Sequence, residues 1–110
     1  MFDTHCHLTF DCFEGRIDRL LADAAADGVR GCISISTTTG DLDRLVALAE
    51  SHDRVWCSAG VHPLYSDRPI DWDVMDRCSR SPRCVAWGEL GLDRHYDRPP
   101  IDLQRRVLEE

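Results

Sequence analysis

The first ten residues, MFDTHCHLTF, place two histidines two positions apart in a short apolar segment. In a β-strand, residues i and i+2 project to the same face, so Asp3, His5 and His7 are expected to point together and Cys6 to point away. Imidazole is a favoured ligand of Zn²⁺ and other transition ions, and two on one face form half of a metal site. On this pair alone, core histidines bonded to backbone carbonyls are the slightly better interpretation.

Two later stretches carry further residues that can bind a metal. AGVHP places His62 just past a predicted strand, and GELGLDRHYD places Glu89 near the end of the next strand, with Asp93 in the loop beyond it. Because these positions meet at the same end of different strands, a bound cation would satisfy a carboxylate that burial alone would penalise. Structural interpretations stay open: Glu89 pairs with an arginine such as Arg94, His62 caps a helix, and Asp93 bonds loop amides.

The elements that would position these residues alternate between strands and helices. Apolar residues recurring at i, i+3 and i+4 predict amphipathic helices, and β-branched apolar runs predict strands. Gly28 is expected to end the first helix, and Thr39 or Asp41 to begin the second. The predicted strands cover 1–8, 31–36, 55–61 and 84–90, and the predicted helices cover 14–27, 42–49, 70–79 and 100–110.

Strands that alternate with helices predict an α/β fold with a parallel sheet covered by helices. Open doubly wound sheets and (β/α)8 barrels share this local pattern, so periodicity alone does not choose between them. A complete barrel needs about 250 residues, and the last predicted helix has no stop signal before Glu110. We therefore expect the chain of 110 residues to be a truncated single domain, 1–110, that holds the first four strand–helix units of a TIM-type barrel.

The charge of the chain limits the ways in which it can hold a phosphate. The net charge is −7, and all 13 basic residues are arginines. This composition disfavours a broad basic surface that binds nucleic acid by counterion release, so bound metal ions would have to neutralise a phosphate substrate. No apolar run is long enough to cross a membrane and no secretory leader is visible, so the cytoplasm is the expected location.

Six cysteines are spread along the chain without a CxxC motif. Three of them, Cys32, Cys57 and Cys84, lie in apolar runs that read as strands. Reduced cysteines that act as small buried apolar side chains are therefore favoured over disulfides or a zinc site.

The segments FDTHCHL, AGVHP and GELGLD, in this order and spacing, resemble the TatD-type metal-dependent DNases of the amidohydrolase-like hydrolases. The resemblance covers the whole chain and includes Gln104 in the last predicted helix. It implies a (β/α)8 barrel with a centre of divalent ions (Mg²⁺, Mn²⁺ or Zn²⁺, two in a complete site) that hydrolyses phosphodiester bonds in DNA. His5 and His7 would then bind one metal. Glu89 would bind or bridge the metals as the catalytic carboxylate, and His62 would contact the scissile phosphate.

The family's centre also needs two histidines and an aspartate from strands beyond Glu110, so the 110-residue chain by itself is expected to be weak or inactive. His95 and Asp93 lie on the correct side to contact substrate, whereas His52 is expected to be a solvated residue at a helix end on the opposite face. An open sheet leaves uncovered apolar edges, which predicts self-association or pairing with a complementary C-terminal half.

Two other functions fit the same residues. A barrel hydrolase with this centre could act on a small amide or ester instead of DNA, because a fold does not determine its substrate. A non-catalytic metal-binding or interaction module is the third alternative. GELGLD favours the nuclease by resemblance only.

Overall fold

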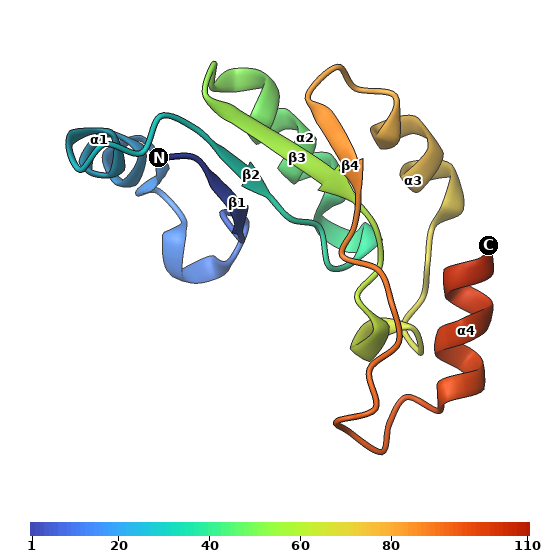
Figure 1. The fold of residues 1–110 in the computed structure, drawn as a ribbon. Helices are drawn as coiled ribbons and strands as arrows, with labels where there is room; N and C mark the ends of the chain where they lie inside the picture. Colours follow the sequence, from blue (N-terminus) through green and yellow to red (C-terminus); the bar gives the residue numbers. More distant parts are fainter.

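The computed structural model describes residues 1–110 as four strands that alternate with four α-helices (Figure 1). The four predicted strand–helix units are therefore confirmed. The strands are shorter than the predicted ranges, because the spacing of apolar residues does not indicate at which residue the pairing between strands ends. The elements are β1 (Asp3–Cys6), α1 (Ile17–Ala26), β2 (Cys32–Ser34), α2 (Leu42–Ser51), β3 (Val55–Ala59), α3 (Trp72–Ser79), β4 (Cys84–Trp87) and α4 (Ile101–Glu109).

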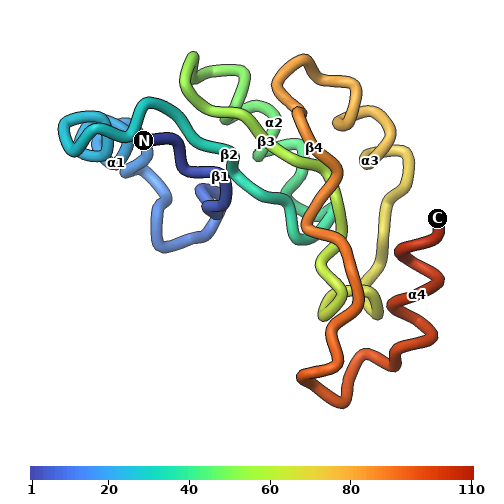
Figure 2. Tube along the Cα trace, in the orientation of Figure 1, coloured from blue at the N-terminus to red at the C-terminus, as the bar shows by residue number.

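The sheet is parallel throughout, in the order β1-β2-β3-β4. Each strand pairs with the next one along the chain, as in a barrel, whereas a doubly wound sheet reverses its strand order at a switch point. The register shifts between Asp3 and Cys6 and again between Cys57 and Ser58. Figure 2 follows the chain from the end of β4 through a long loop to α4, which lies at the opposite side of the molecule from the N-terminus.

The core lies between the sheet and two helices, α2 and α3. It consists of eleven buried residues, namely Leu8, Cys32, Leu42, Leu45, Ala49, Val55, Cys57, Ala59, Val61, Met75 and Cys78. The predicted buried role of the strand cysteines holds for Cys32 and Cys57, and all six thiols are free. By contrast, α1 lies beyond the β1 edge and buries none of its residues completely (Figure 1).

The helix ends follow the predicted turn residues only in part. Gly28 ends α1 with a φ of 89°, a left-handed conformation that glycine adopts without strain. Asp41 stands at the start of α2 as predicted, but its carboxylate makes no capping hydrogen bond. It accepts hydrogen bonds from the hydroxyls of Thr9 (2.7 Å) and Thr38 (3.2 Å) instead.

None of the helices combines the length and apolar composition that crossing a bilayer requires.

Candidate metal centre

Three of the predicted residues meet at the carboxyl end of the sheet. His5 lies on β1, His7 follows it, and Glu89 follows β4, yet one potential ligand atom from each lies within 4.8 Å of the others. His5 Nε2 is 3.5 Å from Glu89 Oε2. The two edges of the sheet therefore contribute to one group of side chains.

The spacing of these atoms fits a divalent ion. Ligand atoms in a tetrahedral Zn²⁺ site lie about 2.1 Å from the metal, which places them about 3.4 Å from one another. The separation of 3.5 Å between His5 Nε2 and Glu89 Oε2 is close to this value. Two imidazoles and a carboxylate are also the donor types that Zn²⁺ and Mn²⁺ accept. Three such ligands leave further coordination positions for substrate, water or other residues.

Hydrogen bonds to the backbone determine which ring nitrogen of each histidine is available. His7 Nδ1 lies 3.1 Å from the carbonyl oxygen of Ile35, and because a carbonyl cannot donate, Nδ1 carries the proton. His7 Nε2 therefore keeps a lone pair for a metal. His62 shows the reverse arrangement, because its Nδ1 accepts the amide hydrogen of Leu64 at 3.1 Å. The proton of neutral His62 is then on Nε2, which lies 3.5 Å from Glu89 Oε1.

Glu89 reaches this group because the chain crosses the end of the sheet after β4. The Gly88 amide donates to the Ala59 carbonyl at the end of β3 (2.8 Å), and the Glu89 amide donates to the Ser36 carbonyl beyond β2 (2.9 Å). The Ser58 hydroxyl donates to the Gly88 carbonyl at 2.6 Å. We call residues 88 and 89 the crossing segment. Glu89 pairs with His5 and His62, and no ion pair joins it to Arg94.

Gly60 allows the crossing segment to pass this close. A Cβ atom at Gly60 would lie 2.5 Å from the carbonyl carbon of Gly88 and 2.7 Å from its oxygen. Both contacts are with backbone atoms, which cannot be relieved by a change of side-chain rotamer. A side chain at this position would push the crossing segment, and with it Glu89, away from the sheet.

Buried serines below the site were not recognised in the sequence. Ser34 accepts the Leu8 amide hydrogen at 3.0 Å. Ser58 Oγ accepts the Ser36 amide hydrogen at 3.1 Å, and the Ser36 hydroxyl donates to the Gly60 carbonyl at 2.8 Å. Each of the three serines is fully buried. The signal that could have found them is a serine at alternate positions of apolar strands, as in ISIS and CSAG.

An aromatic ring beside the site was also missed. The Phe10 ring stacks on the His7 imidazole with centroids 4.8 Å apart and planes 3° from parallel. Phe10 is 48% exposed. Nothing in the local sequence distinguishes this phenylalanine from an ordinary loop residue.

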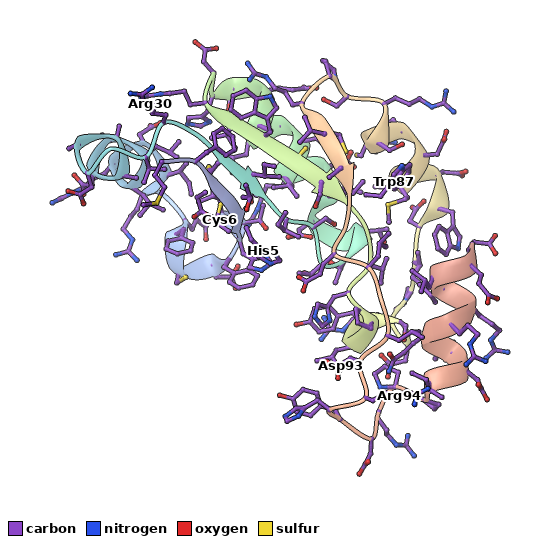
Figure 3. The ribbon with its side chains drawn as sticks, viewed as in Figure 1. His5, Cys6, Arg30, Trp87, Asp93 and Arg94 are labelled. Carbon is purple, nitrogen blue, oxygen red and sulfur yellow. The ribbon has the colours of Figure 1, made fainter.

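Asp93 and His95, predicted to contact substrate, lie outside the group of ligand atoms. They belong to the loop between β4 and α4, and Figure 3 draws Asp93 well away from His5. Asp93 Oδ1 accepts the His95 amide hydrogen at 2.7 Å. The buried Gln104 side chain bonds the Asp93 backbone amide and carbonyl, at 2.7 and 3.1 Å. Asp93 thus has the loop-bonding contacts that were weighed as its structural alternative.

Two other expectations need correction. Asp3 does not join the histidines in the group of potential ligand atoms, which holds only His5, His7 and Glu89. Its carboxylate accepts the His5 amide hydrogen instead (2.9 Å). The register shift after Asp3 breaks the alternation expected along β1. His52 is not a freely solvated residue, since its Nε2 lies 3.0 Å from Asp18 Oδ1. The Leu48 carbonyl and Asp18 raise the pKa of His52 above its usual value.

Comparison with known proteins gives consistent matches over nearly the whole chain. A family model described as "TatD related DNase" matches residues 2–110. The chain is 35% identical over 99 residues to the uncharacterized metal-dependent hydrolase YcfH of Escherichia coli (strain K12). This alignment covers 87% of this chain and 37% of that protein. It is 35% identical over 106 residues to the 3'-5' ssDNA/RNA exonuclease TatD of Enterobacter lignolyticus (strain SCF1), which covers 90% and 40%.

The fold is also similar to a solved structure. The crystal structure of YjjV, a TatD homolog from Escherichia coli K12, matches with a TM-score of 0.87 and 32% identity over 99% of this chain and 44% of that one. The four units therefore match the N-terminal part of a TatD (β/α)8 barrel, as predicted. The chain spans about two fifths of the length of these relatives.

Proposed function

The chain belongs to the TatD related DNase family, and on this basis we propose that it carries part of the active site of a metal-dependent nuclease that hydrolyses phosphodiester bonds in DNA. His5, His7 and Glu89 hold a divalent ion in this proposal. His62 contacts the scissile phosphate, and Asp93 and His95 contact substrate further from the metal. Residues 1–110 form the N-terminal part of one barrel domain.

One observation carries the proposal. Ligand atoms from the two opposite edges of the sheet, on His5, His7 and Glu89, lie within 4.8 Å of one another. The backbone of Glu89 is held by a hydrogen bond to the Ser36 carbonyl, and its carboxylate lies 3.5 Å from an imidazole nitrogen of His5 and of His62. A divalent ion is the partner that matches both the charge and the donor types.

The residues divide the chemistry among themselves. An ion bound at this group would supply Lewis-acid activation of water and positive charge for the phosphate, which the net charge of −7 does not provide. His7 is fixed by the Ile35 carbonyl with Nε2 free to bind. His62 presents a proton on Nε2 beside Glu89, where it can donate to an anionic phosphate oxygen. Glu89 lies 3.5 Å from the Nε2 atoms of His5 and His62, and its carboxylate would help to hold the ion.

The proposal also specifies the kind of metal ion, the number of ions and the substrate. Mg²⁺, Mn²⁺ or Zn²⁺ fits the donor set, and two ions fill a complete centre. The relative named metal-dependent hydrolase supports the use of a metal, and the relative named ssDNA/RNA exonuclease supports a nucleic-acid substrate. Because this chain offers only three ligand atoms, we expect it to bind an ion but to turn over DNA slowly.

Pairing with a complementary C-terminal half is also part of the proposal. β4 is an edge strand, and Val85 and Trp87 are 51% and 64% exposed. Further strand–helix units of the barrel would cover both. Sedimentation of the chain alone and mixed with the remaining part of the barrel tests this, because pairing predicts a stable complex of the two parts.

Metal titration calorimetry of the 110-residue chain with Mn²⁺ and Zn²⁺ tests the central claim. We expect saturable binding that falls by at least about tenfold in His5→Ala and in Glu89→Gln. His52→Gln is the matched control, because it removes a histidine that also contacts a carboxylate but lies at another end of the molecule. Equal affinity in all four proteins would contradict the proposed site.

DNA cleavage tests the activity. In a protein extended to the length of the relatives, we expect Mg²⁺- or Mn²⁺-dependent hydrolysis of DNA that a chelator and Glu89→Gln abolish. Rapid hydrolysis of amides or simple esters with DNA left intact would overturn the nuclease proposal in favour of the amide or ester alternative. Metal binding without hydrolysis of any of these substrates would favour the non-catalytic module.

A further inference from the structure

Two cysteines face each other across the strands that lead into the candidate metal centre. Cys57 on β3 and Cys84 on β4 are direct partners in the parallel register. Neighbouring strands lie about 4.8 Å apart, and the Cα atoms of disulfide-bonded cysteines lie about 4.4–6.8 Å apart. The pair therefore meets the first geometric requirement for a bridge without rearrangement of the sheet.

The two thiols differ in accessibility. Cys57 is fully buried under the helices, whereas Cys84 is half-buried on an edge strand. A reagent from solvent therefore meets the Cys84 sulfur first. The interaction with the neighbouring Cys57 thiol lowers the pKa of Cys84 to about 7, and the same interaction together with burial raises the pKa of Cys57. A thiolate is the nucleophile in disulfide exchange, so Cys84 is the attacking sulfur of the pair.

A third cysteine, Cys78, lies near the pair, but its thiol is hydrogen-bonded to another residue. The Cys78 thiol on α3 donates to Asp43 Oδ1 at 3.3 Å. Burial raises the pKa of Cys78 to about 11, which keeps it protonated at neutral pH. Cys84 is thus the partner that the structure offers to Cys57.

We propose that Cys57 and Cys84 form a redox-sensitive dithiol that a low-molecular-weight disulfide converts into a cystine bridge between β3 and β4. The Cys84 thiolate attacks one sulfur of the small disulfide, forming a mixed disulfide and releasing one small thiolate. Cys57 then passes its proton to the released thiolate and attacks the Cys84 sulfur, which forms the protein disulfide and releases the second small thiolate. Two protein thiols are oxidised, one small disulfide is reduced to two thiols, and the protons balance.

The bridge would lie close to the candidate metal centre. Cys57 precedes His62 by five residues and Cys84 precedes Glu89 by five residues. The bridge would link β3 and β4 directly below the point at which the crossing segment passes over Gly60. The inference does not depend on nuclease activity or on a bound metal, and it is tested without either.

The experiment uses the 110-residue chain with oxidised glutathione as the probe. After acid quenching, unfolding and alkylation of the remaining thiols, mass spectrometry counts the alkylated cysteines. Trypsin then separates the candidates, because Cys57 falls on peptide 55–77, Cys78 on 78–80 and Cys84 on 84–94. We expect two fewer alkylated cysteines per chain and a disulfide-linked pair of peptides 55–77 and 84–94.

Variants separate the two steps. Cys57→Ser is expected to stop at one glutathione adduct on peptide 84–94, and Cys84→Ser to prevent the loss of the Cys57 thiol. Cys12→Ser is the matched control, because Cys12 is exposed on another segment and its removal should leave the bridge unchanged. A bridge between other peptides, a lasting adduct on Cys84 of the unmutated chain, or no reaction of Cys84 would overturn the proposal. These readings come from the unmutated chain and hold even if a variant fails to fold.

Discussion

The two central strands and the two edge strands of this sheet have different roles. β2 and β3 are mostly buried and carry the serines that bond neighbouring strand ends. β1 and β4 are mostly exposed, yet they lead to His5, His7 and Glu89. The potential metal ligands therefore lie where the sheet is least packed. Their positions come from hydrogen bonds that the central strands provide.

Strand spacing makes the same point quantitatively. β1 and β4 are separated by three strand intervals, about 14 Å in a flat sheet. His5 and Glu89 nevertheless approach to 3.5 Å. The crossing segment closes much of this gap, because it carries Glu89 past β3 to the Ser36 carbonyl beyond β2. The centre is thus built by the central strands from residues on the edges.

The largest effect is expected at Gly60, where the crossing segment that follows the edge strand β4 packs against the end of β3. Gly60→Ala would place a Cβ 2.5 Å from the Gly88 carbonyl carbon. Relief of this overlap has to move backbone, so we expect a loss of about 3 kcal/mol in the free energy of unfolding, together with weaker Mn²⁺ binding. Chemical denaturation and metal titration measure the two effects.

The control for that substitution is Gly40→Ala, where the nearest atom to the new Cβ is Thr38 Oγ1 at 3.6 Å, an ordinary contact. Gly40→Ala should leave both quantities nearly unchanged. If Gly60→Ala were equally silent, the crossing segment would not depend on close approach to β3, and the distinction between centre and edge would lose its main support.

A smaller effect is expected from the hydrogen bonds of the central strands. Ser58→Ala removes the buried acceptor of the Ser36 amide and the partly buried donor to the Gly88 carbonyl. Leaving these groups without partners should cost about 2 kcal/mol, and metal affinity should fall because Glu89 is adjacent to Gly88. Ser79→Ala, which removes an exposed hydroxyl bonded within α3, is the matched control. A Ser58→Ala protein with normal metal affinity would show that the crossing segment holds its place without this contact.

The sequence predicted the parts of this arrangement that depend on local pattern. Four strand–helix units follow from apolar spacing, and the meeting of His5, His7 and Glu89 follows from the rule that parallel strands end on the same side. Gly60 and Ser58 were not recognised, because their roles depend on Gly88, which follows the neighbouring strand β4 and is far away in the sequence. Asp3 was misplaced because a register shift is not visible in a pattern of alternation.

The error at His52 has a similar origin and gives the smallest prediction. Its partner, Asp18, is 34 residues away on α1, so no local pattern indicates the contact. This contact attaches the loosely packed helix beside β1 to α2, which covers the central strands. It is therefore a polar link between the edge region and the centre.

The Leu48 carbonyl and the Asp18 carboxylate raise the pKa of His52 in the folded chain. A group whose pKa is raised by folding stabilises fully below its unfolded value of about 6.5, and the contribution is lost as pH rises through the folded value. His52→Gln should therefore cost up to about 0.5 kcal/mol near pH 5.5 and almost nothing near pH 8.5, because solvent screens the exposed Asp18 carboxylate. Denaturation at both pH values measures the difference, and Asp18→Asn should reproduce part of it. Equal losses at both pH values would mean that the link between α1 and α2 does not depend on the charge of His52.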